Sequence, residues 1–181
     1  AEMRNTNLHL TDFRNANLYG AILHDVDMHM AILLGADLTD AGLLGAYLHK
    51  ANLEGAIMTD VHADFADLSQ AKLKGVDLQN AALIGANLES AQLQGANLTR
   101  ADLGRANLSN ADLRDADLSE SNLDSANLTD ARLRGAILEG ANLVGARQLL
   151  ERQHLRVLPR QRPLCDSRGS ELRLPRSFRV Y

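Results

Sequence analysis

Three histidines are the side chains of this sequence whose type and spacing best suit chemistry. His9, His29 and His49 recur at one constant interval. If the chain returns to the same place once in each such interval, their imidazoles stack, and neighbouring rings could share a metal ion or form a pH-sensitive ladder. An imidazole ordinarily protonates at about pH 6.5, and stacked charged rings would repel one another. No third type of ligand accompanies them, and a column of exposed neutral rings is the alternative interpretation.

Carboxylates recur in register with the histidines and form a second candidate site. The interval from Asp37 to Asp77, and again from Asp77 to Asp117, is twice the interval between the histidines. A chain that repeats its course at the histidine interval would place these carboxylates on one side, opposed by the single cation Arg100. We name the following set the acidic stripe: Asp37, Asp77, Asp117, Asp40, Asp60 and Glu120.

Apolar residues at outward positions form a third candidate, which we name the apolar patch: Leu10, Met30, Ile32 and Leu34. Exposed apolar patches on a folded protein often mark a protein interface. Chemistry of the catalytic kind has no comparable signature here. Cys165 is the only cysteine, and there is no His-Glu-x-x-His motif, no phosphate-binding glycine loop and no nucleophile elbow. The sequence therefore predicts a protein that is not an enzyme and has no cofactor.

A five-residue repeat positions all of these side chains. From Thr6 to Gly145 the pattern recurs 28 times without a slip. Position 3 is Leu in 24 repeats, position 1 is Ala in 22, and position 2 is usually Asn or Asp. Ala and Leu favour helices, but five residues advance a helix by roughly 500°, so successive leucines would occupy every side of it. A coil with one repeat on each of four sides instead points every position 1 and position 3 inward.

These tandem Ala-(Asn/Asp)-Leu-X-X units resemble those of the pentapeptide repeat proteins. The resemblance covers 140 of the 181 residues and implies an all-β fold, a right-handed quadrilateral β-helix (solenoid). Four repeats to a coil give seven coils, from 6–25 to 126–145, after a lead-in of residues 1–5. At about 4.8 Å between coils the rod is roughly 34 Å long. One repeat departs from the pattern, because Ala63 stands at its centre; we expect a local distortion there, with Phe65 leaning over the space.

The resemblance also suggests an alternative function. The quinolone-resistance members of this family resemble DNA and bind gyrase or topoisomerase, and the acidic stripe is consistent with such mimicry. Those proteins usually have more Phe centres and a hydrophobic C-terminal dimer contact. This chain has Leu centres and a basic C-terminal segment, which puts the mimicry in doubt.

After Ala146 the composition changes abruptly, because residues 147–181 contain all three prolines and nine arginines. Residues 146–158 are predicted to form a capping helix that ends before Pro159, since the ends of repeat proteins need covering. Residues 159–181 are predicted to be a basic, extended or disordered arm. Its candidate contact residues are Arg160, Arg162, Arg176 and Arg179.

The function predicted from these features is that of a bacterial protein-binding module, a scaffold or assembly factor, whose partner the sequence does not identify. Two copies can also stack end to end through the first coil, because an open β edge invites pairing. The rod is not expected to bind nucleic acid directly, and no apolar run is long enough to span a membrane. We expect a cytoplasmic protein, with the question of a removed leader peptide left open.

Overall fold

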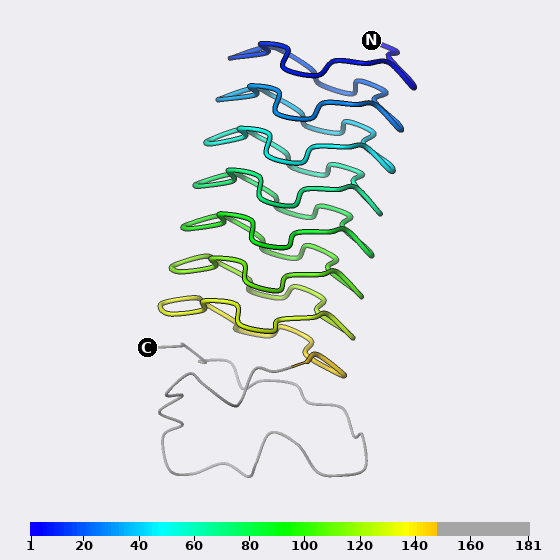
Figure 1. The fold of residues 1–181 in the computed structure, drawn as a ribbon. Helices are drawn as coiled ribbons and strands as arrows, with labels where there is room; N and C mark the ends of the chain where they lie inside the picture. The colour runs from blue at the N-terminus through cyan, green and yellow to red at the C-terminus, as the bar shows by residue number, and fades with distance from the viewer. Residues whose placement is uncertain (148–181) are drawn as a thin grey trace, which may run out of the picture.

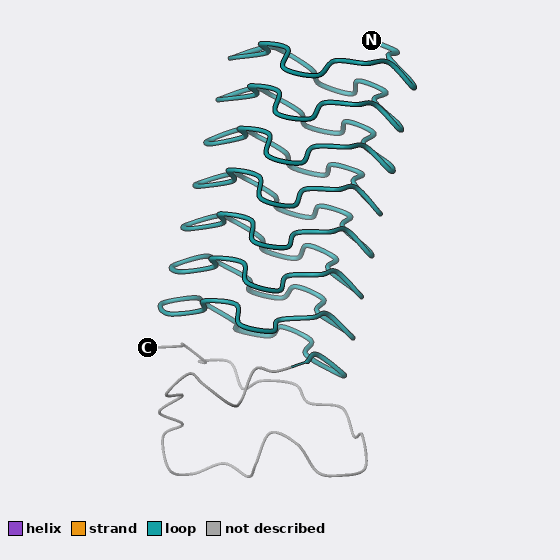
Figure 2. Ribbon diagram, in the orientation of Figure 1, coloured by secondary structure: helices purple, strands orange, loops and turns teal. Residues whose placement is uncertain are grey.

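The computed structural model describes residues 1–147, which wind into a stack of flat coils (Figure 1). The residue at position 2 of each repeat pairs in parallel with the residue four repeats further on, from Glu2 with Ile22 to Asn127 with Arg147. Four repeats therefore complete one coil, and residues 1–140 make seven coils. Within residues 1–147 there is no helix and no strand longer than a single bridging residue; turns join the bridges (Figure 2).

The four sides of the coil each recur once per coil. We name them by their first repeats: the first side begins with residues 1–5, the second with 6–10, the third with 11–15 and the fourth with 16–20. The histidine column lies on the second side and the acidic stripe on the fourth. The apolar patch spans the corner between the second and third sides.

Backbone hydrogen bonds within and between coils use four of the five N–H groups of a typical repeat. Position 1 bonds within its own coil, position 2 bonds the coil before, and positions 3 and 5 bond the coil after. The repeat 81–85 and its successor show the pattern: Ala82 N to Val61 O at 2.9 Å, Leu83 N to Asp102 O at 2.8 Å, Gly85 N to Gly104 O at 2.9 Å and Ala86 N to Leu83 O at 3.1 Å. Only the N–H at position 4 needs a partner from a side chain.

The core is a continuous column of position 1 and position 3 side chains. Every one of these residues from Leu18 to Ala141 is buried. Met3, Leu8, Phe13 and Leu143, nearer the ends of the described rod, are only partly buried. The polar exception at position 1 is Ser121, which is 1% exposed and satisfies its hydroxyl by donating to the carbonyl of Leu118 at 2.7 Å.

Both boundaries of the solenoid differ from the expected residue ranges. Residues 1–5, set apart above as a lead-in, form a repeat of the first coil, because Glu2 pairs with Ile22 and the N–H of Met3 bonds the carbonyl of Ile22 at 2.9 Å. Ala146 and Arg147 continue the coil, with Arg147 paired to Asn127. The remainder of the expected capping helix and the whole basic arm, including Arg160, Arg162, Arg176 and Arg179, lie outside the described residues.

The repeat centred on Ala63 is not distorted, contrary to expectation. Its N–H bonds the carbonyl of Ala82 at 2.8 Å, as in any other repeat. Phe65 does not lean over the space at the centre but is 67% exposed. The reason is its location at position 5, where the side chain points outward and the ring lies against Gly85 of the next coil.

The corners of the coil have a backbone conformation that ordinarily favours glycine. Position 5 has a positive φ in every described repeat, at values such as 55° for Met30 and 62° for Gly55. Together with the bond from position 1 of the next repeat back to position 3, this corresponds to the second central residue of a type II turn. Glycine at a corner can also make room for a side chain from the coil before, as Gly85 does for Phe65.

Gly85→Ala tests this second role of the corner glycines. A Cβ at Gly85 would lie 2.7 Å from the Phe65 ring, whereas one at Gly55 meets nothing within 4 Å. Because both sites have the same positive φ, Gly55→Ala is the matched control for backbone strain. We expect Gly85→Ala to lower the free energy of unfolding by roughly 0.5–1.5 kcal/mol more than Gly55→Ala, the cost of moving the ring off its rotamer. Equal urea midpoints for the two variants would contradict the contact.

Candidate interaction surface

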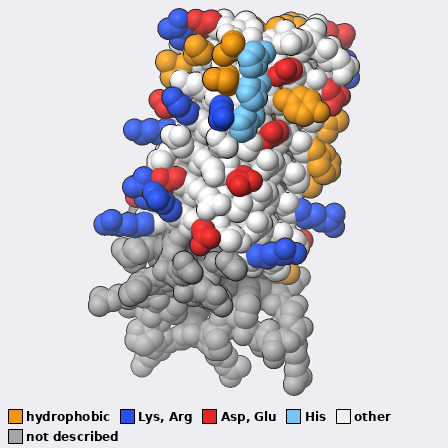
Figure 3. All heavy atoms as spheres, in the orientation of Figure 1, with side chains coloured by type: hydrophobic (Ala, Val, Ile, Leu, Met, Phe, Trp, Pro, Cys, Tyr) orange, Lys and Arg blue, Asp and Glu red, His pale blue; other side chains and the backbone are white. Residues whose placement is uncertain are grey.

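The three histidines form a stacked column on the second side, visible in pale blue near the N-terminal end (Figure 3). The ring centroids of His9 and His29 are 5.1 Å apart with planes inclined by 18°, and those of His29 and His49 are 4.8 Å apart with planes inclined by 24°. The column exists because position 4 of each repeat lies directly beyond position 4 of the repeat one coil earlier.

The column ends in a hydrogen-bonded chain of three side chains. The Nδ1 of His49 lies 2.7 Å from Oγ of Ser69, and that hydroxyl lies 2.6 Å from Oδ1 of Asp67. A carboxylate can only accept, so the Ser69 proton is directed to Asp67 and His49 donates through Nδ1. This fixes the tautomer of His49. The order of contacts does not suit nucleophilic catalysis, since the carboxylate faces the serine and Ser69 is only 7% exposed.

Stacking is a poor geometry for metal binding because parallel rings do not converge on one point. Within residues 1–147, no group of three His, Cys, Asp or Glu side chains is placed to hold a metal ion. The pH response of the column remains a prediction.

A hollow of about 640 Å³ lies beside the histidine column on the same side of the rod. It is wide open, a surface depression rather than a closed cavity. Its floor and walls come from the first three coils: Asn5, Thr6, Asn7, His9, Asp25, Asp27, His29 and Tyr47. Tyr47 is 54% exposed and stands at position 2, where short Asn and Asp side chains are the rule.

The acidic stripe divides into two kinds of carboxylate. Asp37, Asp77 and Asp117 occupy position 2 and are half-buried, and each accepts the N–H of the residue two further on, at 3.0, 3.1 and 2.9 Å. The hydrogen bond from the Thr39 side chain holds the pKa of Asp37 below its ordinary value. Asp40, Asp60 and Glu120 are exposed at position 5; Asp60 accepts from Asn80, and Glu120 pairs with Arg100 at 2.8 Å.

This arrangement explains the Asn and Asp preference at position 2. Their Oδ1 atoms supply the acceptor that the position 4 N–H lacks in the backbone pattern, as in an Asx turn. Where position 2 is Ala82, the acceptor for the N–H of Ile84 is Oδ1 of Asp64 in the coil before, at 2.8 Å. Half of the acidic stripe is therefore part of the turns that build the rod.

The same side chains form ladders along the rod, a feature that the sequence analysis missed. Asn127 donates to Asn107, Asn107 to Asn87 and Asn87 to Asp67, with distances of 3.1, 3.2 and 3.1 Å. Each amide donates to the coil before, so a ladder can begin at a carboxylate but cannot continue through one. The ladders could have been predicted from one signal: an Asn at position 2 that stands four repeats after an Asp or Asn at the same position.

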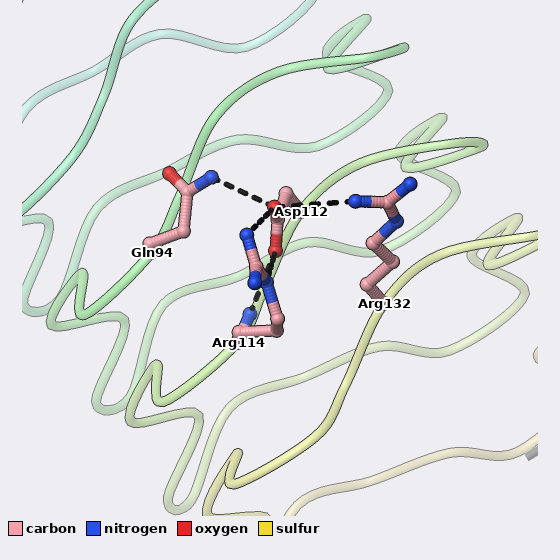
Figure 4. Close-up of polar contacts among 4 residues, drawn as sticks. All are labelled: Gln94, Asp112, Arg114 and Arg132. Carbon is pink, nitrogen blue, oxygen red and sulfur yellow. Dashed lines mark hydrogen bonds and ion pairs between the residues drawn. The ribbon is translucent and has the colours of Figure 1, made fainter.

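Asp112 on the third side is the most heavily paired carboxylate of the rod (Figure 4). Arg114 donates to it through Nε at 2.7 Å and through its terminal guanidinium nitrogen at 2.6 Å. Gln94 donates from the coil before at 2.8 Å, and Arg132 lies 4.0 Å away in the coil after. The Asp112 side chain is only 13% exposed. The bond from Arg114 is the main cause that holds the pKa of Asp112 below its ordinary value.

Asp112→Asn is expected to reduce stability in a pH-dependent way. Since the folded pKa lies below the unfolded value of about 3.9, ionised Asp112 stabilises the fold above that value. The contribution disappears as pH falls through the folded pKa. The variant should therefore unfold at lower urea than the parent at pH 7, with the difference shrinking as the pH falls below the unfolded pKa of about 3.9. Asp40→Asn, at an exposed corner, serves as the control, and a pH-independent difference for Asp112→Asn would contradict the pairing.

The apolar patch is exposed and belongs to a larger set. Leu10, Met30 and Leu34 are 59%, 44% and 40% exposed, while Ile32 is half-buried. The structure adds six more exposed large apolar side chains, which lie on the first, second and fourth sides: Tyr19, Leu44, Tyr47, Ile57, Phe65 and Ile84. All nine fall between Leu10 and Ile84, and the described residues beyond Ile84 contribute none. Apolar side chains accordingly gather toward the N-terminal end in Figure 3.

Comparison with known proteins identifies the class to which this fold belongs. Eight copies of the pentapeptide repeat pattern match residues 1–29, 22–60, 64–100, 101–140 and 126–147. The chain belongs to the pentapeptide repeat family, whose fold is the right-handed quadrilateral β-helix.

Solved structures of pentapeptide repeat proteins are similar to it. HetL, involved in heterocyst differentiation regulation in the cyanobacterium Nostoc sp. strain PCC 7120, is 32% identical over 80% of this chain and 84% of its own, with a TM-score of 0.48. Another protein of Nostoc PCC 7120 is 49% identical over 44% of this chain and 66% of its own, with a TM-score of 0.44. QnrB1, a plasmid-mediated fluoroquinolone resistance protein, is 15% identical over 81% of this chain and 85% of its own, with a TM-score of 0.54.

No curated protein matches the chain. Residues 1–147 contain no helix long and apolar enough to cross a membrane.

Proposed function

We propose that this protein is a non-enzymatic, protein-binding rod, a scaffold or assembly factor of the cytoplasm, whose N-terminal part, residues 1–84, contacts the partner. The observation that carries the proposal is the distribution of exposed large apolar side chains: within residues 1–147, all nine lie between Leu10 and Ile84. The core is already filled by positions 1 and 3, so these outward side chains contribute little to the fold. Burial against a partner would remove them from water.

The partner contacts more than one side of the rod. Leu44 and Ile84 lie on the first side, Leu34 on the third and Ile57 on the fourth. A single flat side only a few coils long offers a small area, whereas specific protein interfaces bury about 800 Å² on each partner. Contact with adjoining sides around a corner supplies the missing area.

The C-terminal half of the rod has the composition of a surface that remains in water. Its cations between residues 85 and 147 are spread over the sides: Arg100, Arg105, Arg114, Arg132, Arg134 and Arg147. Three of them, Arg100, Arg114 and Arg132, are paired with carboxylates of the rod itself. We expect this half to act as a spacer between the binding half and residues 148–181.

A pair of triple variants tests the proposal. Met30→Gln, Leu44→Gln and Ile57→Gln remove apolar surface from three sides, at positions 5, 4 and 2. The chain already has glutamine at each of these positions, in Gln70, Gln94 and Gln92, so the fold should tolerate the changes. The control is Arg132→Gln, Arg134→Gln and Arg105→Gln, at positions 2, 4 and 5 of coils beyond Ile84.

Full-length chains of each kind are used to capture proteins from a lysate of the source organism, with quantitative mass spectrometry as the readout. Proteins specific to the parent should fall by about tenfold or more with the apolar variant, which corresponds to a loss of about 1.4 kcal/mol. They should persist with the control. Retention by the apolar variant, or loss only with the control, would refute the assignment of the contact to the N-terminal coils.

The alternative function, DNA mimicry toward gyrase or topoisomerase, has less support. Mimicry requires carboxylates that project from the rod, but Asp37, Asp77 and Asp117 are half-buried and accept backbone N–H groups. If mimicry operates, neutralising these three residues should abolish inhibition of supercoiling.

End-to-end stacking of two copies through the first coil likewise remains a proposal, and a monomeric mass at micromolar concentration would argue against it.

A further inference from the structure

Asp27 differs from every other aspartate at position 2 of the described repeats. Position 2 has eight aspartates in residues 1–147, and seven of them are bonded by a side chain. The donors are as follows: Arg14 to Asp12, Thr39 to Asp37, Ser69 and Asn87 to Asp67, Asn97 to Asp77, Asn122 to Asp102, Arg114 and Gln94 to Asp112, and Ser119 to Asp117. Asp27 receives only the backbone N–H of His29, at 3.0 Å.

Two neighbours leave Asp27 without a side-chain donor: His29 at position 4 of its own repeat, whose ring stacks in the histidine column, and Tyr47. Tyr47 stands one coil after Asp27 at position 2, where an asparagine would donate to the carboxylate, as Asn87 does to Asp67. A phenol at the end of a long rigid side chain cannot reproduce that short contact. Tyr47 instead projects from the rod, 54% exposed, and both residues line the hollow beside the histidine column.

The hollow combines groups that suit one kind of ligand. It has two carboxylates, Asp25 and Asp27, and no lysine or arginine among its lining residues. It has an exposed aromatic ring on one side and the rings of His9 and His29 on another. Negatively charged hydrogen-bond acceptors beside the faces of aromatic rings are complementary to a planar cation.

We propose that this hollow receives an arginine side chain of the partner protein, a proposal that rests on the protein-binding function above. The guanidinium stacks on the exposed ring of Tyr47 and donates to the carboxylate of Asp27, with Asp25 as a second acceptor. Arginine fits better than lysine because its charge is planar and delocalised, and its several N–H donors form a fork that matches a carboxylate. The contact supplies the side-chain donor that Asp27 lacks within its own chain.

Three model peptides test the ligand. The probes are N-acetyl-Gly-Arg-Gly-amide, the lysine equivalent, and the citrulline equivalent, which keeps the shape of arginine without its charge. Each is titrated into the full-length protein while NMR follows the ring protons of His29 and Tyr47. We expect saturable shifts with the arginine peptide at millimolar concentration, and binding weaker by about tenfold or more with citrulline and by about fivefold with lysine. Equal binding of citrulline or lysine, or no saturable shift, would overturn the proposal.

Two variants test the site without weakening the fold. Tyr47→Asn places at position 2 the residue that donates to the preceding carboxylate elsewhere, so it should satisfy Asp27 internally while removing the aromatic ring. Asp27→Asn keeps an acceptor for the N–H of His29 and removes the charge. Both should weaken binding of the arginine peptide by about tenfold. Ile57→Asn, the same kind of change at position 2 of another side, is the control and should bind as the parent does; unchanged binding by Tyr47→Asn would refute the site.

Failure of this inference and failure of the proposed function are distinguishable. The peptide titrations report on the hollow with no partner present. The capture experiment with Met30→Gln, Leu44→Gln and Ile57→Gln leaves the residues lining the hollow unchanged. A parent that captures proteins through its apolar side chains but ignores the arginine peptide would retain the function and lose only the arginine anchor.

Discussion

Leu108→Ala is expected to lower the free energy of unfolding by about 2–5 kcal/mol, the largest effect of any single change considered for this rod. Leu108 is fully buried at position 3, and its backbone is held in place by a bond from its N–H to the carbonyl of Asn127 at 2.8 Å. The coils cannot collapse onto the space, because each side is fixed by such bonds to the coil before and the coil after. The removed methyl groups therefore leave a cavity, and urea unfolding followed by circular dichroism measures its cost.

The control for Leu108→Ala is Lys72→Ala, a truncation at an exposed position 2. Surface substitutions of this kind usually change stability by no more than about 0.5 kcal/mol. If Leu108→Ala changed stability as little as Lys72→Ala does, the stacked leucines would not be the main source of cohesion. The hydrogen bonds between coils would then have to supply it.

The burial pattern of this rod follows directly from the period of its sequence. A repeat of five residues is incompatible with an amphipathic helix, and a repeat whose positions 1 and 3 are small and apolar requires two inward residues per side. Position alone therefore assigns Leu108 to the core and Asp40 to the surface. The sequence interval between stacked side chains follows from the number of sides, which the family resemblance supplied.

Side-chain direction at the corners did not follow from the period. Phe65 was expected to turn inward because its neighbour Ala63 is small, which treats apolar character as the deciding property. The backbone decides instead: at position 5 a φ of 58° points the side chain away from the axis. An apolar residue placed there is exposed whatever the space inside, and the same holds for Leu10 and Met30.

The candidate site was predicted in part for a related reason. The histidine column depends only on spacing, so the stacking of His9, His29 and His49 could be predicted from the sequence. Whether Asp27 receives a side-chain hydrogen bond depends in part on the residue one coil later. An asparagine there donates to the carboxylate, as Asn87 does to Asp67, whereas Tyr47 does not. The residue at position 4 of the same repeat and the residue one coil later, rather than single columns of charge, determine which carboxylates of such a rod are available to a partner.

Ala63→Leu is expected to raise the free energy of unfolding by roughly 1.5 kcal/mol, because burial of the added carbons outweighs the loss of rotamer freedom. Ala63 is fully buried at position 3, between Leu43 and Leu83 of the adjoining coils, and its hydrogen bonds to the next coil are as short as theirs. The backbone there is thus the one that leucine occupies elsewhere, and we expect the added carbons to occupy the place that a leucine side chain has in the other repeats. Burial of about 0.8 kcal/mol per carbon, less about 0.5–1 kcal/mol of lost rotamer freedom, gives the expected gain.

Two further variants make this expectation decisive. Ala86→Leu adds the same carbons at position 1, which is alanine, valine, threonine or serine throughout the repeats, and overpacking should lower stability by about 1–3 kcal/mol. The double variant Ala63→Leu with Leu108→Ala should equal the sum of its parts within about 0.5 kcal/mol, since the sites lie more than two coils apart. A loss of stability in Ala63→Leu would mean that Leu43 and Leu83 already fill the space. In that case the neighbouring leucine side chains would have adjusted to fill the space at Ala63 while the backbone stayed in place. The even spacing of the coils would then give no sign of this adjustment.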